Sequence, residues 1–173
     1  MSDKKAKLGV LGLMMEGYEP IFPGVLEAQK QFLDGVLATC KETAEFVFPR
    51  VAGTREDIEA IVEQYNHDGL DGILIVALAY SPGQYLVRAM QNNRLQLAMV
   101  LIQPADTVKA EFTTWDHTVN QGIHGAQDNA NCLRRAGIPC AYFAGEWRKP
   151  AFISSILPNL FSPIHLMIFC IAG

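Results

Sequence analysis

A polar string of nine residues, Asn120–Asp128, contains the side chains of this chain that are best suited to bind a small ligand. Its apolar spacing predicts the start of a helix, and Gln121 and His124, three residues apart, would share one face of the first turn. An amide and an imidazole both donate and accept hydrogen bonds, which suits the hydroxyl groups or the carbonyl group of a ligand. Asn120 is expected to cap this helix. The alternative interpretation is that Gln121 and His124 are capping or surface groups without a ligand.

The elements that position this string alternate regularly along the chain. Helices with an apolar stripe are expected to begin near residues 23, 54, 81 and 121, and short apolar runs between them predict strands at 7–13, 45–48, 72–77, 97–102 and 139–143. This alternation predicts a three-layer α/β/α fold, flavodoxin-like (Rossmann-like), with a mostly parallel sheet of about five strands. Residues 7–13 and 72–77 are expected to be central strands.

Local signals support the helix starts and locate the loops. Thr54 and Asp57 resemble a capping box, and Ser81, followed by Pro82, is expected to cap the next helix. Ligands in such folds lie at the carboxyl ends of the strands. The loops expected there are 14–19, 80–83 and 103–120, the last of which carries the polar and aromatic segment 113–117. The string that contains Gln121 and His124 follows this third loop directly.

Composition excludes several classes of protein. The 173 residues suit one domain, and the net charge of -4 leaves no basic stripe for nucleic acid. No apolar segment of a signal peptide stands at the start, and the cysteines show neither a C-x-x-C pair nor a disulfide framework, so a cytoplasmic protein is expected. These cysteines are Cys40, Cys132, Cys140 and Cys170.

The end of the chain differs from the rest. Residues 151–173 contain no charged residue and two prolines, and the apolar run after His165 is too short to cross a membrane, so no membrane partner is expected. We divide the chain into a domain of residues 1–148 and an atypical apolar tail, 149–173. The tail is interpreted as a truncated or non-native continuation, or alternatively as a terminal helix and strand that pack on the domain.

Three motifs together resemble one known family. The Asn120–Asp128 string, the pair Trp115–Asp116 upstream, and the turn Ala79–Gly83 after an apolar strand are similar to the N-terminal region of L-arabinose isomerase-like proteins, in the arabinose/fucose isomerase superfamily. The similarity covers roughly residues 7–148. It implies an aldose–ketose isomerase of carbohydrate metabolism that uses manganese in its full-length form. The family's metal ligands and acid–base carboxylates belong to later domains, so neither a metal site nor catalytic residues are expected in this chain.

The resemblance also implies which residues contact the substrate. His124 and Gln121 match the family's pair that reaches a sugar shared with a neighbouring subunit, and Tyr80 matches an aromatic residue that also reaches it. A homo-oligomer is therefore implied for the full-length protein. Met14 stands about where the family has a glutamine, which leaves the identity of the pentose or hexose open.

Two functions remain open from the sequence. In the first, the chain is the N-terminal substrate-site and oligomerisation domain of an L-arabinose isomerase-like enzyme, cut short and inactive alone. In the second, it is a free-standing flavodoxin-like module that binds a small ligand or a partner without catalysis. The histidines form no metal-binding pattern, and Glu16 and Glu19 are interpreted as solvated loop residues. No glycine motif supports nucleotide binding.

Overall fold

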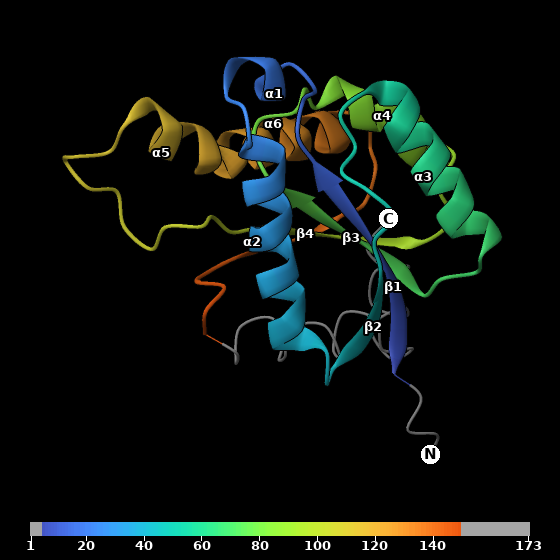
Figure 1. The fold of residues 1–173 in the computed structure, drawn as a ribbon. Helices are drawn as coiled ribbons and strands as arrows, with labels where there is room; N and C mark the ends of the chain where they lie inside the picture. Colours follow the sequence, from blue (N-terminus) through green and yellow to red (C-terminus); the bar gives the residue numbers. More distant parts are fainter. Residues whose placement is uncertain (1–4, 150–173) are drawn as a thin grey trace.

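Five short strands form one fully parallel sheet in the computed structural model, which describes residues 5–149. The strand order is β2-β1-β3-β4-β5 (Figure 1), which is the order of the flavodoxin-like fold. The predicted fold class is confirmed. The strands are β1 (Ala6–Leu13), β2 (Ala44–Val47), β3 (Gly72–Ala77), β4 (Gln96–Leu101) and β5 (Ala141–Ala144).

Helices cover both faces of the sheet and complete three layers. Alternate residues of β1 point to opposite faces, so Val10 belongs to the apolar cluster under α2, and Leu11 belongs to the cluster under α3, α4 and α6. Figure 1 shows α2 and α3 on opposite sides of the strands. The helices are α1 (Tyr18–Ile21), α2 (Val25–Cys40), α3 (Arg55–His67), α4 (Gln84–Gln91), α5 (Thr114–Val119) and α6 (Gly122–Arg135).

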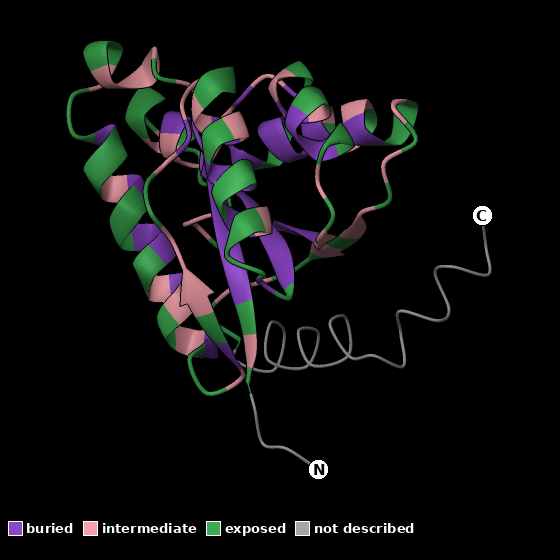
Figure 2. Ribbon diagram, turned by 90° about the vertical axis from the view of Figure 1, so that its right-hand side faces the viewer, coloured by how far each residue is buried: buried purple, intermediate pink, exposed green. Residues whose placement is uncertain are grey.

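The two central strands supply most of the buried surface. All six residues of β3 are buried, and β1 is buried from Leu8 to its end, as the purple strands of Figure 2 show. The register pairs Leu8 with Gly72 and Leu13 with Ala77. Strands buried on both faces read as continuous apolar runs, which is why the sequence located these two strands closely.

Tyr65 ties α3 to the sheet. Its side chain is fully buried, and its hydroxyl group donates toward the carbonyl oxygens of Val10 (2.7 Å) and Val47 (3.0 Å). The ring lies against Gly9, where a Cβ atom would stand 2.5 Å from the ring. Burial raises the pKa of the Tyr65 phenol. A glycine in the middle of β1 therefore leaves space for an aromatic ring that joins two strands to one helix.

One helix start follows its sequence signal and another does not. The Thr54 side chain accepts the Asp57 backbone N–H at 3.1 Å, so its capping role is confirmed, although Asp57 accepts from the Gly53 N–H (3.3 Å) and not from the N–H of Thr54. The prediction that Ser81 caps α4 is wrong. Ser81 is buried, Gly83 occupies the N-cap position, and its N–H donates to a carboxylate on α6.

The segment 113–117, interpreted from the sequence as a loop, contains the start of a helix. Thr113 and Asp116 form a reciprocal capping box at the N-terminus of α5. The Asp116 carboxylate accepts the Thr113 N–H at 2.8 Å, and the Thr113 hydroxyl accepts the Asp116 N–H at 3.2 Å. α5 has only six residues, and a helix of this length is too short for a periodic apolar pattern to be recognised in the sequence.

The predicted tail, residues 149–173, lies outside the described residues from position 150 onward. Among residues 5–149, no helix is both long enough and apolar enough to cross a bilayer. The boundary expected at residue 148 follows β5 closely.

Replacing Tyr65 with Phe tests the contact that joins α3 to the sheet. We expect Tyr65→Phe to lower the free energy of unfolding by about 1–3 kcal/mol, because it removes the donor shared by two strand carbonyl groups in a buried site. Urea denaturation would measure the change. Tyr85→Phe is the matched control, since Tyr85 is only partly buried, and we expect it to cost less than about 0.5 kcal/mol. Equal losses for the two variants would contradict the assignment.

Candidate functional site

The first turn of α6 lies directly on the end of β3. A Cβ atom at Gly122 would collide with the carbonyl oxygen of Ala77, and one at Gly125 would lie 2.8 Å from the carbonyl oxygen of Ala79. Both glycines are buried. Glycine is required at both positions because the helix backbone lies so close to the strand and loop backbone that no Cβ atom would fit.

Asn120 does not cap α6, contrary to the sequence prediction. It is the C-cap of α5, and its side chain accepts the Ala105 N–H (2.8 Å) and donates to the Asp116 carbonyl oxygen (2.7 Å). Gln121 occupies the N-cap position of α6 without a hydrogen bond from its side chain to the helix. The unpredicted α5 explains the error, since Asn120 completes that helix and joins it to the loop after β4.

Gln121 is held by a residue from a distant part of the chain. The Tyr18 hydroxyl, on α1 after β1, donates to Oε1 of Gln121 at 3.0 Å. Burial raises the pKa of the Tyr18 phenol. With its amide oxygen engaged, Gln121 keeps its amide nitrogen as the group that can donate to a ligand.

His124 is exposed on the first turn of α6, and its backbone N–H donates to the Gln121 carbonyl oxygen at 3.1 Å. Exposure of His124 agrees both with a ligand contact and with the alternative interpretation of a surface group. Gln121 and His124 stand together at the amino end of α6, next to the carboxyl end of β3.

Tyr80 lies beside the same turn, but its hydroxyl group is already bonded. It donates to Oδ2 of Asp128 at 3.2 Å, and the same oxygen accepts the Gly83 N–H at 2.8 Å. Burial and the neighbouring Asp128 carboxylate raise the pKa of the Tyr80 phenol. The structure thus brings Tyr80, Gln121 and His124 to one edge of the sheet. The Tyr80 hydroxyl and the Gln121 amide oxygen are hydrogen-bonded within the protein, whereas the His124 side chain is exposed.

Tyr18 and Asp128 are the site residues that sequence reasoning missed. Each acts through a contact between segments far apart in the sequence, 103 residues for Tyr18–Gln121 and 48 for Tyr80–Asp128. Asp128 follows His124 by four residues, so the two are neighbours on the helix surface. This spacing is the signal in the sequence that could have identified Asp128 as a site residue.

The acidic loop after β1 also differs from its interpretation. Glu16 is exposed, but the Glu19 carboxylate accepts the backbone N–H groups of Gly24 and Leu26, both at 2.8 Å. These hydrogen bonds lower the pKa of Glu19, because they favour the charged form. Glu19 therefore secures the start of α2 instead of standing free in solvent.

A backbone hydrogen bond joins the two loops at the point where the strand order reverses, between β1 and β3. The Met15 N–H donates to the Tyr80 carbonyl oxygen at 3.1 Å, and the Met14 side chain is buried in the core. Met14, which stands where the resembling family has a glutamine, therefore does not face a ligand.

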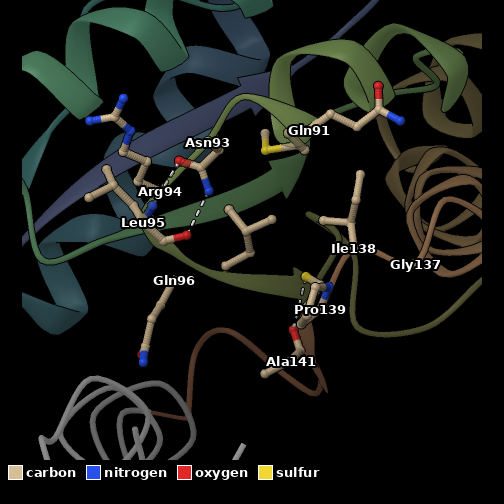
Figure 3. A pocket seen from close by; sticks show the side chains of 12 residues that line it. Gln91, Asn93, Arg94, Leu95, Gln96, Gly137, Ile138, Pro139 and Ala141 are labelled. Atoms are coloured by element: carbon tan, nitrogen blue, oxygen red, sulfur yellow. Dashed lines mark hydrogen bonds between the residues drawn. The ribbon is translucent and has the colours of Figure 1, made fainter. Parts of the chain in front are cut away.

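Open space occurs on both edges of the sheet near β4 and β5. A cavity of about 260 Å³ lies at the carboxyl ends of these strands and includes Ile123 of α6. A larger cavity, of about 470 Å³, lies at the opposite edge, among the end of α4, the start of β4 and the turn before β5 (Figure 3). There the side chain of Asn93 both donates to and accepts from the backbone of Leu95.

The described residues, 5–149, were also compared with the ligand groupings of metal sites. Within residues 5–149, no three His, Cys, Asp or Glu side chains are grouped so that they could hold a metal ion.

Comparisons with known proteins give little further guidance. No family model and no curated protein match the sequence. Among solved structures, the UDP-rhamnose synthase L780 from Acanthamoeba polyphaga mimivirus is similar with a TM-score of 0.39 and 9% sequence identity. The match covers 88% of this chain and 62% of that one, so this chain spans less than two thirds of the length of that enzyme.

Gly122→Ala tests the contact between α6 and β3. In an unobstructed helix, Ala is favoured over Gly by roughly 0.5–1 kcal/mol. Here the added methyl group would meet the Ala77 carbonyl oxygen, and we expect a net loss of about 1–3 kcal/mol in the free energy of unfolding. Gly17→Ala is the control, because its Cβ would stand 3.7 Å from the Met15 side chain. A Gly122→Ala protein as stable as the parent would show that α6 does not lie on the strand end.

Asp128→Ala tests the Tyr80 contact. Because the negative charge of Asp128 disfavours the phenolate, its removal should lower the pKa of Tyr80 toward the ordinary value of a tyrosine. A pH titration of the Tyr80 ring signals by NMR would measure this. Gln127→Ala, an exposed change on the same helix, should leave that pKa unchanged. A Tyr80 pKa that does not respond to the loss of Asp128 would argue against the contact.

Proposed function

We propose that this chain is the N-terminal substrate-site and oligomerisation domain of an L-arabinose isomerase-like aldose–ketose isomerase, inactive alone. The observation that carries the proposal is the pairing of an exposed imidazole, His124, with Gln121, whose amide oxygen is held by Tyr18. Both groups stand at the carboxyl edge of a parallel sheet, where α/β proteins bind ligands. The motif resemblance is the reason for proposing a sugar as the ligand.

The role of these residues is binding and orientation. The Gln121 amide nitrogen donates to a sugar oxygen, and the His124 imidazole contacts a second hydroxyl group. In the family, manganese polarises the carbonyl and hydroxyl oxygens of the sugar, and its ligands come from other domains. This chain therefore supplies one half of a site, and a neighbouring subunit supplies the metal half.

Exposed apolar side chains support assembly into a homo-oligomer. Ile21 and Val108 are 71% and 69% exposed, and Trp115 and Ile123 are 36% and 42% exposed. They belong to α1, to the loop after β4, and to α5 and α6, all of which lie toward the carboxyl edge of the sheet (Figure 1). Contact with another chain would remove these exposed apolar side chains from water. The free cysteines Cys40, Cys132 and Cys140 agree with a cytoplasmic enzyme.

The alternative function is a free-standing module that binds a small ligand or a partner without catalysis. The cavity of about 470 Å³ at the amino edge of the sheet favours it, since its size is typical of small-molecule sites. Met90, Leu97 and Ile138 give this cavity an apolar wall, and none of the proposed sugar contacts belongs to it.

A chimera tests the isomerase proposal. Residues 1–148 would replace the corresponding domain of an L-arabinose isomerase, and we expect manganese-dependent aldose–ketose conversion. His124→Ala in the chimera should lower kcat/KM by up to roughly tenfold, because one hydrogen bond is worth about 0.5–1.5 kcal/mol. The fold should be unaffected, since His124 is exposed.

His67→Ala is the matched control, because His67 is also exposed but ends α3 at the opposite edge of the sheet. It should leave kcat/KM unchanged. The 173-residue chain alone should convert no sugar, with or without manganese. Conversion by the chain alone, or equal activity of the His124→Ala and parent chimeras, would refute the proposal.

A further inference from the structure

The cavity at the amino edge of the sheet has a mainly apolar wall. Its volume of about 470 Å³ falls within the range of roughly 300–1,000 Å³ that is typical of small-molecule sites. The end of α4, the start of β4 and the turn before β5 form the wall (Figure 3). Met90 and Leu97 are almost fully buried, and Ile138 and Ala141 are half-buried. Transfer of an apolar ligand from water to such a wall is favourable.

The wall offers no partner to a charged ligand. Among the described residues that line the cavity, Arg94 alone carries a charge. Arg94 is exposed, and Figure 3 shows its guanidinium directed away from Ile138. The Asn93 amide nitrogen donates to the Leu95 carbonyl oxygen at 2.6 Å, and the Asn93 amide oxygen accepts the Leu95 N–H at 3.1 Å. A charged group that entered the cavity would therefore lose its hydration without gaining an ion pair.

Two sulfur-containing side chains belong to the wall. Met90 comes from the end of α4, and Cys140 directly precedes β5. The Cys140 thiol donates to the Ala141 carbonyl oxygen at 3.5 Å, and burial raises its pKa to about 12, so it remains neutral. Sulfur is polarisable and makes favourable contacts with aromatic rings. The wall therefore favours an aromatic ring over a saturated group of equal size.

We propose that this cavity binds a small, uncharged molecule that contains an aromatic ring. The ring packs between Leu97 and Ile138 and contacts the sulfur of Met90. This inference gives a ligand class to the free-standing binding module, which is the second candidate function, and it rests on that function. The site uses neither Gln121 nor His124, so it stands or fails separately from the isomerase proposal.

Methyl NMR tests the proposal on the full 173-residue chain. A bound aromatic ring shifts the signals of the methyl groups beside it, so the methyl groups of Ile138 and Ala141 report occupancy of the cavity. Titration with indole, an uncharged aromatic probe, should shift both sets of signals saturably. The Ile123 methyl signals are the internal control, because Ile123 belongs to the cavity at the other edge of the sheet and should not respond.

Two variants test the geometry, with the Ala141 methyl signal as the reporter. Ile138→Phe places a larger side chain in the wall and should raise the Kd for indole by roughly tenfold or more. Ile123→Phe is the matched control and should leave the Kd unchanged. Met90→Leu keeps the apolar volume but removes the sulfur, so the fold should persist while the Kd rises roughly twofold to tenfold.

Absence of a saturable shift at Ile138 and Ala141 would overturn the proposal. A Kd that is the same in the parent, Ile138→Phe and Met90→Leu proteins would overturn it as well. Tighter binding of the anion indole-3-carboxylate than of indole would contradict the assignment of an uncharged ligand. His124→Ala should leave the Kd for indole unchanged, which separates this test from that of the isomerase proposal.

Discussion

The contact between the first turn of α6 and the end of β3 determines the arrangement of the carboxyl edge. Gly122 and Gly125 let helix backbone rest against the carbonyl oxygens of Ala77 and Ala79, where any larger residue would collide. From this position α6 presents Asp128 to Gly83 and so secures the start of α4. The same contact places His124 at the edge of the sheet with its side chain exposed.

The polar groups around this contact are mostly bonded to each other. Tyr18 occupies the amide oxygen of Gln121, Asp128 occupies the hydroxyl group of Tyr80, and Glu19 caps α2. Such internal bonds hold side chains in place and reduce the rotamer freedom that a ligand would otherwise have to restrict. Among the described residues proposed to contact a ligand, the His124 imidazole and the Gln121 amide nitrogen keep their hydrogen-bonding capacity. A set of this kind agrees with the proposed role of this chain as one half of a shared sugar site.

The loops at the strand-reversal point are joined to each other by a backbone hydrogen bond. In flavodoxin-like folds the crevice between β1 and β3 is the usual site. Here the Met15–Tyr80 hydrogen bond joins the loops on either side of it, Met14 is buried, and a cavity of about 260 Å³ lies beside β4 and β5. Ile123 belongs to that cavity, and its neighbour His124 stands exposed on the same turn. The cavity proposed for an aromatic ligand lies at the opposite edge of the sheet, so the two proposed sites use different residues.

Local pattern alone determined the fold class, the strands and most helices. A strand that is buried on both faces must be an apolar run, as in β3. A Thr three residues before an Asp predicts the start of a helix, as at Thr54. The same pattern placed Gln121 and His124 at the start of a helix after β4. Tertiary structure decided the rest, because the deciding partners are distant in sequence. Asn120 completes α5 instead of capping α6, Ser81 is buried while Asp128 serves the start of α4, and Tyr18 orients Gln121 from 103 residues away. Hydrogen bonds of this kind depend on which loops the sheet brings together, and no spacing within a single segment records them.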